Sequence, residues 1–169
     1  MILPATRDPR MISIRRGGSL TDEDHRLLAL WAADCAAHVL GYFERAVPGD
    51  LRPSAAIAAA QAWAAGDMAM MRARAAGGHA MGAARRLSGA ARFAAYAADQ
   101  AACVGHVAEH DLGAAAYAIK AVVAAHPGDA DAGRRERDWQ RGRLPEPVRA
   151  LVLDDQARRN DICWSVFST

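Results

Sequence analysis

The sequence contains few of the features that mark secreted, membrane-spanning or sheet-rich proteins. It has only three cysteines, far apart and without a C-x-x-C pair, so a disulfide scaffold is not expected. Its longest apolar run, residues 113–125, is interrupted by Lys120 and falls short of the roughly 20 residues that cross a bilayer. Residues 1–20 lack the apolar segment of about 7–15 residues that a signal peptide needs. These absences predict a cytoplasmic protein with reduced thiols and no membrane contact.

Motifs for nucleotide binding and for nucleophilic catalysis are absent as well. The chain has no G-x-x-x-x-G-K-[ST] loop, no G-x-G-x-x-G after a strand and no G-x-S-x-G elbow. Nucleic-acid binding is disfavoured because the net charge is only +2 and because Glu136 and Asp138 interrupt the arginine cluster around them. We therefore expect no nucleic-acid partner, no cofactor and no catalytic activity.

Alanine dominates what is present, with 42 of the 169 residues. It is the best helix former, and β-branched residues are few, which excludes an all-β fold. A chain of this length forms one compact domain. We predict a single all-α domain, an irregular bundle of five to seven helices. Within it, residues 1–20 are a flexible N-terminal segment, residues 21–153 the helical domain and residues 154–169 a C-terminal tail; Met11 is a second candidate for the true start.

Capping and breaking residues define the first two helices. Thr21 followed by Asp24 is a capping-box variant, which predicts a helix start. Pro48-Gly49 predicts the end of that helix. A second helix then tolerates Pro53 in its first turn and ends at Gly66, a favoured C-cap residue.

The later helices have weaker signals. Asp67 is expected to cap a short third helix that Gly77-Gly78 ends. Residues 79–109 have a helical pattern throughout, with one break expected near Ser88-Gly89. Further helices are expected over residues 110–126, from Asp129 or Asp131 through Trp139, and around residues 148–152, ahead of a tail that docks on the bundle.

The core predicted from this composition is thin. An alanine buries only about one methyl group beyond the backbone, so the helices must approach closely, near the short end of the roughly 8–10 Å interaxial range. A second subunit would bury additional surface and add stability, so a homodimer is a further expectation for this chain. Aromatic residues make up 6% of the chain. They are expected to anchor the core: Trp31, Tyr42, Phe43, Trp63, Phe93, Tyr96, Tyr117 and Trp139.

Two groups of polar residues have the spacing of metal ligands. In a continuous helix, His106 and His110 lie four residues apart, with Asp99 on the same side. Asp34 and His38 repeat the spacing on the first helix. Such ligands on facing helices can hold a divalent metal, so the alternative function is a metal-binding bundle protein or enzyme with this cluster between the first and fourth helices. The other interpretation is that both groups are solvated polar faces.

Three segments together resemble a known family. They are residues 24–36 (DHRLLALWAADCA), residues 110–122 (HDLGAAAYAIKAV) and residues 137–140 (RDWQ), the last ahead of Leu144-Pro145. They are similar to the all-helical immunity proteins of bacterial polymorphic toxin systems, and the similarity extends over residues 21–153. The resemblance implies a cytoplasmic protein that binds and neutralises a cognate toxin by covering it, with no catalysis of its own.

Charged residues suggest where such a partner would bind. Electrostatic complementarity sets the rate of capture and the discrimination between partners. Arginine suits an interface better than lysine because its planar group makes bidentate contacts and is weakly hydrated. The candidates are an acidic group at the start of the first helix and an arginine group on the sixth: Asp22, Glu23 and Asp24, and Arg134, Arg135 and Arg137.

Overall fold

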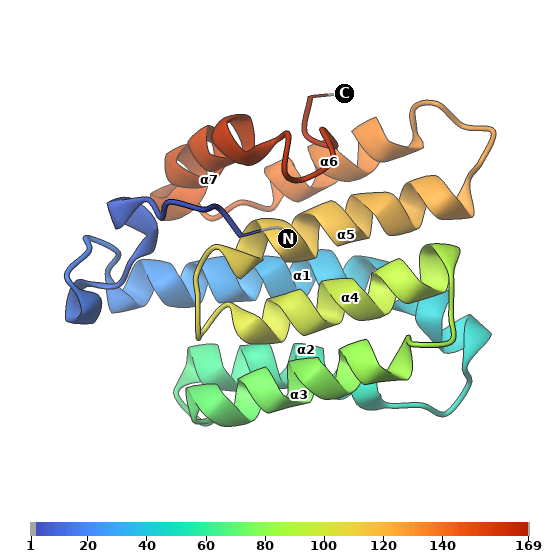
Figure 1. Cartoon of the computed structure of the whole chain (residues 1–169), viewed down its shortest axis with the longest axis horizontal. Coiled ribbons are helices and arrows are strands. Elements are labelled where there is room, and N and C mark those ends of the chain that lie inside the picture. Colours follow the sequence, from blue (N-terminus) through green and yellow to red (C-terminus); the bar gives the residue numbers. More distant parts are fainter. Residues whose placement is uncertain (1–2, 169) are drawn as a thin grey trace.

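The computed structural model describes residues 3–168, and over this range the chain forms seven α-helices (Figure 1). Two short 3-10 helices come first, η1 (Pro9–Met11) and η2 (Ile14–Arg16). The prediction of an all-α fold with five to seven helices is confirmed. The helices are α1 (Asp22–Ala46), α2 (Arg52–Ala65), α3 (Met70–Ala83), α4 (Gly89–Cys103), α5 (His110–Ala125), α6 (Ala132–Gly142) and α7 (Glu146–Arg159).

The central helix of the bundle is α1, which contacts α2, α4, α5 and α7. The α4 helix lies beside it and contacts α2, α3 and α5 as well. The α2–α3 pair covers one side of this centre, and α6 and α7 lie on the other side, next to α5 (Figure 1).

The predicted caps of α1 and α2 are confirmed. The hydroxyl of Thr21 accepts a hydrogen bond from the backbone N–H of Asp24 at 3.0 Å, which satisfies one of the free N–H groups of the first turn. The helix ends before Pro48. Pro53 lies in the first turn of α2, and Gly66 caps its end with a φ of 88°, a left-handed conformation that glycine adopts without strain.

The predicted bounds of α3 are wrong. It begins at Met70, with Ala69 rather than Asp67 as its N-cap, and runs through Gly77 to Ala83. Gly77 is buried against α4, where a Cβ atom would lie 2.8 Å from the backbone oxygen of Asp99. The glycine therefore allows α3 and α4 to pack closely, and this packing offsets the stability that glycine costs inside a helix.

The predicted helix over residues 79–109 is also corrected. The break at Ser88-Gly89 is confirmed, but α4 ends at Cys103, and turns connect it to α5. Gly105 lies in this connection, with the position of a Cβ atom only 2.7 Å from the indole of Trp63. The backbone leaves its helical path here and packs directly on the Trp63 ring.

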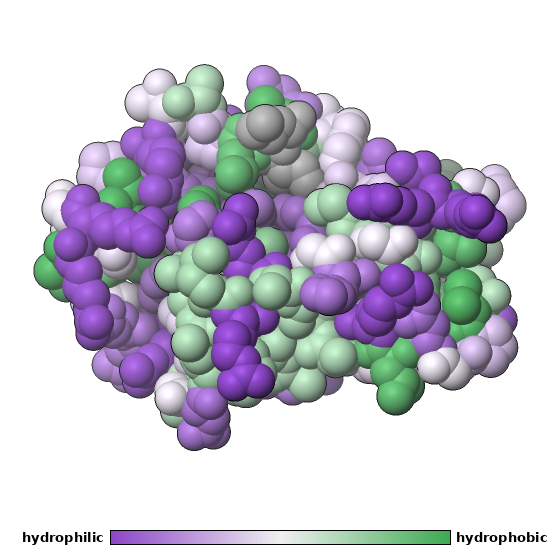
Figure 2. Space-filling model, turned by 60° about the horizontal axis from the view of Figure 1, so that its bottom comes forward, coloured by the Kyte–Doolittle hydropathy of each residue, from purple (hydrophilic) through white to green (hydrophobic). Residues whose placement is uncertain are grey.

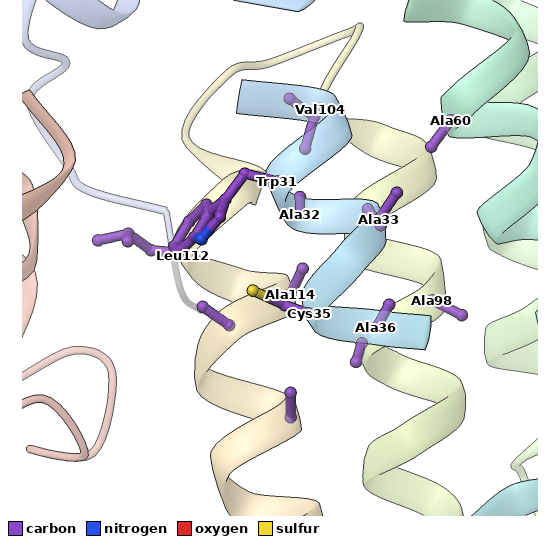
Figure 3. Close-up of a cluster of buried hydrophobic side chains, with 14 of the residues drawn as sticks. Trp31, Ala32, Ala33, Cys35, Ala36, Ala60, Ala98, Val104, Leu112 and Ala114 are labelled. Atoms are coloured by element: carbon purple, nitrogen blue, oxygen red, sulfur yellow. The ribbon is translucent and has the colours of Figure 1, made fainter. Parts of the chain in front are cut away.

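Alanine fills the core, as the composition predicts. Trp31 and Phe43 are completely buried, whereas the other six expected aromatic anchors are partly buried around the edge of the core. Figure 3 shows Trp31 of α1 next to Leu112 of α5, with alanines of α1, α4 and α5 close by. Trp31 and Phe43 are therefore the two largest of the fully buried side chains.

Both ends of the described chain pack on the helices. The sequence predicts a flexible segment over residues 1–20, but in its described part Met11 and Leu20 are buried in the core. The predicted tail, residues 154–169, instead begins inside α7, which extends to Arg159. Beyond that helix Cys163 and Phe167 are buried, which confirms that the end of the chain docks.

Lys120, the only lysine of the chain, helps to hold this C-terminal segment. Its Nζ lies 3.9 Å from the ring centroid of Trp164 and 4.9 Å from that of Phe93. Trp164 and Ser165 both have positive φ angles, a conformation that costs energy in non-glycine residues. The cation–π contact offsets part of that cost.

We expect Lys120→Met to lower the free energy of unfolding by about 0.5–2 kcal/mol, because methionine keeps the apolar stem but removes the charge over the two rings. Urea denaturation measures the change. Lys120→Arg keeps the cation and serves as the control. Equal losses in both variants would contradict a cation–π origin.

Candidate functional site

The acidic group predicted as a partner interface lies in the first turn of α1. Asp22 and Glu23 are exposed and Asp24 is half-buried. Asp22 is already paired with Arg15, which comes from the connection between η1 and α1. The group is therefore partly neutralised within the chain.

The arginines predicted on α6 are also paired internally. Arg134 pairs with Asp131 at 2.7 Å, and Arg135 pairs with Asp129. The Arg137 side chain is only 11% exposed and binds Asp138 at 2.8 Å. The two predicted groups lie at opposite ends of the bundle, where α1 and α6 begin (Figure 1). They do not form one continuous surface.

The structure brings His38 to α6 rather than to α4. Its Nδ1 lies 2.8 Å from Oε2 of the buried Glu136, and its ring stacks on Trp139 with centroids 3.7 Å apart. The other oxygen of Glu136 accepts a hydrogen bond from Gln140 at 2.9 Å. Asp34 is exposed one turn earlier on α1. These contacts hold α1 against α6, and the polar side chains of His38 and Glu136 are engaged in the hydrogen bond between the two helices.

His106 and His110 do not share a helix. His106 lies in the connection after α4, and His110 is the first residue of α5. The Nδ1 of His110 lies 2.8 Å from the side-chain oxygen of Gln100, whose amide donates to Asp99 at 2.9 Å. Burial raises the pKa of Asp99. Burial also raises the pKa of Cys103 to about 12, so that thiol stays protonated.

The five residues of the metal interpretation therefore do not form one site. Over residues 3–168, no three His, Cys, Asp or Glu side chains are grouped so that they hold a metal ion. The predicted arrangement assumed a helix that continues to His110, whereas α4 ends at Cys103 and His38 lies against α6.

The low pKa of His110 predicts sensitivity to acid. Burial lowers it to about 4, whereas histidine in an unfolded chain titrates near 6.5. Between these values the unfolded state binds more protons, so the stability from this group is complete above pH 6.5 and is lost as the pH falls towards 4. The natural protein should therefore lose stability between pH 7 and pH 4.5. We expect this loss, measured by urea denaturation, to be smaller in His110→Gln by on the order of 2 kcal/mol. The same loss in both proteins would contradict this assignment.

A buried ionic network at the start of α5 has no signal in the sequence. Glu109 is 1% exposed and accepts two hydrogen bonds from Arg7, at 2.6 and 2.7 Å. Arg159 of α7 is 3% exposed and contacts Asp155 at 2.5 Å and Asp111 at 3.3 Å. Its partners lie 4 and 48 residues away in the chain. A contact over 48 residues cannot be predicted from the periodicity of one helix. The network ties both ends of the chain to the bundle.

A cleft of about 510 Å³ lies between α3 and α4. Its floor includes the polar group around Asp99 and His110 together with Gly78, whose Cβ position has no atom within 4 Å. Met71 and Met81 of α3 border the cleft and are 55% and 44% exposed. Ligand and partner grooves are commonly lined by apolar side chains, and methionine adapts to varied partners.

The α3 helix is where sequence reasoning overlooked a candidate surface. Residues 68–98 contain five arginines and no acidic residue, a charge bias that would have indicated it. We call the exposed side of this helix the α3 face and define it as Met71, Arg72, Arg74, Ala75, Gly78 and Met81. Figure 2 brings the α2–α3 side forward and shows pale, weakly hydrophobic surface crossed by hydrophilic side chains.

Among the described helices, none is both long enough and apolar enough to cross a membrane. A family model described as Imm-5 like putative immunity protein matches residues 18–147, a range that contains α1 through α6 completely. The comparisons with curated proteins and with solved structures gave no match.

Proposed function

Because the chain belongs to the Imm-5 like immunity protein family, we propose that it binds a cognate toxin and neutralises it by covering it, without catalysis of its own. The observation that carries this proposal is the pair of exposed methionines, Met71 and Met81, beside the cleft between α3 and α4. A partner that covers them would remove apolar surface from water, the main driving force of protein association. The family membership supports a toxin as the partner, and the exposed methionines beside the cleft support this side of the molecule as the place where it binds.

The rigidity of the bundle supports this role. Buried alanines along α1, α4 and α5 let these helices pack closely, and the ion pairs of Glu109 and Arg159 fix the two ends of the chain. A preorganised surface loses little conformational entropy when it binds. An inhibitor that acts by covering its target does not need a conformational change.

The test needs the toxin itself, which is to be sought among the toxin domains encoded by genes next to that of this protein. We expect co-expression to restore the growth of cells that produce the toxin, and the purified proteins to form a complex of fixed stoichiometry in size-exclusion chromatography. Protection by amounts of this protein far below those of the toxin would contradict the proposal, because a covering inhibitor acts one molecule at a time. Failure to protect at equal amounts would also contradict it.

A further inference from the structure

The α3 face and the turn that follows it carry a group of exposed arginines without an ion-pair partner within residues 3–168. Arg72 and Arg74 are exposed, as are Arg85 and Arg86 just beyond the helix end. In the described part of the chain, no carboxylate lies within ion-pairing distance of any of the four. Outside residues 68–98 acidic residues outnumber basic ones. The positive charge of the protein is therefore concentrated here.

The arginines of α6 provide the contrast. Arg134 and Arg135 are also exposed, but each pairs with an aspartate of the preceding loop. A partner would have to compete with those aspartates. The arginines of α3 have no carboxylate partner among the described residues. An acidic partner therefore does not have to displace one, and the whole of its electrostatic attraction contributes to binding.

The shape of the α3 face also fits a protein partner. Ala75 forms a low ridge between two clefts, one shared with α4 and one of about 400 Å³ shared with α2. Arg72 lines the α2 side and Arg74 the α4 side, so positive charge flanks the ridge on both sides. The small side chain of Ala75 lets the backbone of a partner approach closely. Arg72 and Arg74 can then contact that partner on either side.

We propose that the α3 face is the docking site for the toxin, and that the toxin contacts it with an acidic surface. This inference rests on the proposed function and specifies which surface acts. It also constrains the mode of inhibition. Proteins that bind nucleic acids do so with positively charged surfaces, which the unpaired arginines would repel. If the toxin acts on a nucleic acid, the α3 face binds it beside its substrate-binding surface rather than on it.

The experiment compares two matched charge reversals. The first variant carries Arg72→Glu and Arg74→Glu on α3, and the second carries Arg134→Glu and Arg135→Glu on α6. Each changes two exposed arginines on a helix, and glutamate has a helix propensity close to that of arginine. Circular dichroism and thermal unfolding confirm that both variants fold. The binding partner, in the growth assay and in surface plasmon resonance, is the toxin used in the test of the proposed function.

We expect the α3 variant to bind at least tenfold more weakly, mainly through slower association, and to lose protection. The α6 variant should bind within about threefold of the natural protein. Raising the salt concentration should weaken the natural complex far more than the remaining binding of the α3 variant. A complex that is insensitive to salt contradicts the acidic partner surface.

The outcomes separate this inference from the proposed function. If the natural protein does not protect, the proposed function itself fails. If it protects and the α3 variant protects equally, the docking site is wrong and the function stands. Loss of protection in the α6 variant alone would assign the interface to α6. A dimer of this chain that the α3 reversal dissolves would assign the face to a second copy and overturn the proposal.

Methionine oxidation gives a readout that does not depend on charge. Met71 and Met81 should be oxidised by peroxide in the free protein and protected in the complex, whereas the buried Met11 should stay unreacted in both. Oxidation of Met71 and Met81 at equal rates in the free and bound protein would contradict docking at the α3 face.

Discussion

Replacing Arg159 with alanine is expected to lower the free energy of unfolding by about 3–5 kcal/mol, the usual cost of breaking a buried ion pair from one side. The Arg159 side chain is almost completely buried, contacts Asp155 and Asp111, and donates to the backbone oxygen of Glu109 at 2.9 Å. Without it, the buried Asp111 loses its cation, and Asp155 keeps a 3.4 Å contact with the half-exposed Arg158. Urea denaturation monitored by circular dichroism measures the loss.

The effect should depend on pH, because burial already raises the pKa of Asp111 to about 7. An aspartate in an unfolded chain titrates near 3.9, so the folded state binds the extra proton and stability falls as the pH rises between these values. Removing Arg159 raises the pKa of Asp111 further and should enlarge this fall. We therefore expect the variant to lose more stability at pH 8 than at pH 5. Arg158→Ala, at a half-exposed neighbour, is the control, and an equally large loss there would contradict the argument.

Trp31→Ala should have an effect of similar size, about 3–5 kcal/mol, the range for an aromatic side chain truncated in a core. Trp31 is 1% exposed, and its indole N–H donates to the backbone oxygen of Gln140 at 2.9 Å. The substitution opens a cavity between α1 and α5 and leaves that oxygen without its donor. Few other large side chains lie near enough to fill the space in an alanine-rich core.

Two further substitutions separate the causes. Trp31→Phe keeps a ring and loses the hydrogen bond, so it should cost less than the alanine variant. Trp164→Ala removes the same side chain from a half-exposed position and should cost less, because it removes only ring contacts such as those with Lys120 and Tyr117. A denaturation midpoint left unchanged by Trp31→Ala would place Trp31 outside the core.

The parts of the fold that the sequence predicts depend on local interactions. The Thr21 cap, the end of α1 before Pro48 and the Gly66 cap are each determined within a few residues, and the structure has them where they are expected. The errors at Gly77 and Gly105 have a different cause. Both glycines contact residues more than twenty positions away, Asp99 and Trp63. Sequence rules treat glycine as a helix breaker, whereas packing determines its role here.

The candidate site was predictable only in part. Arginine was expected to form the interface, but the local spacing of acids was not used to choose among the arginines. Arg134 has Asp131 three residues earlier and pairs with it, whereas Arg74 has no acidic residue near it in the sequence. The acid-free composition of residues 68–98 is visible in the sequence, yet it indicates a binding surface only when α3 is known to lie on the outside of the bundle.

The contact between Gly77 and α4 bears on how this protein and its partner change over evolution. At this contact any residue larger than glycine would strike the Asp99 backbone, so α3 and α4 would have to move apart to accept it. Under the proposed docking at α3, adaptation to an altered toxin would come from replacing outward-pointing side chains on α3, while the glycine stays fixed. Lineages that face different toxins should therefore diverge on one side of this helix and remain uniform on the other.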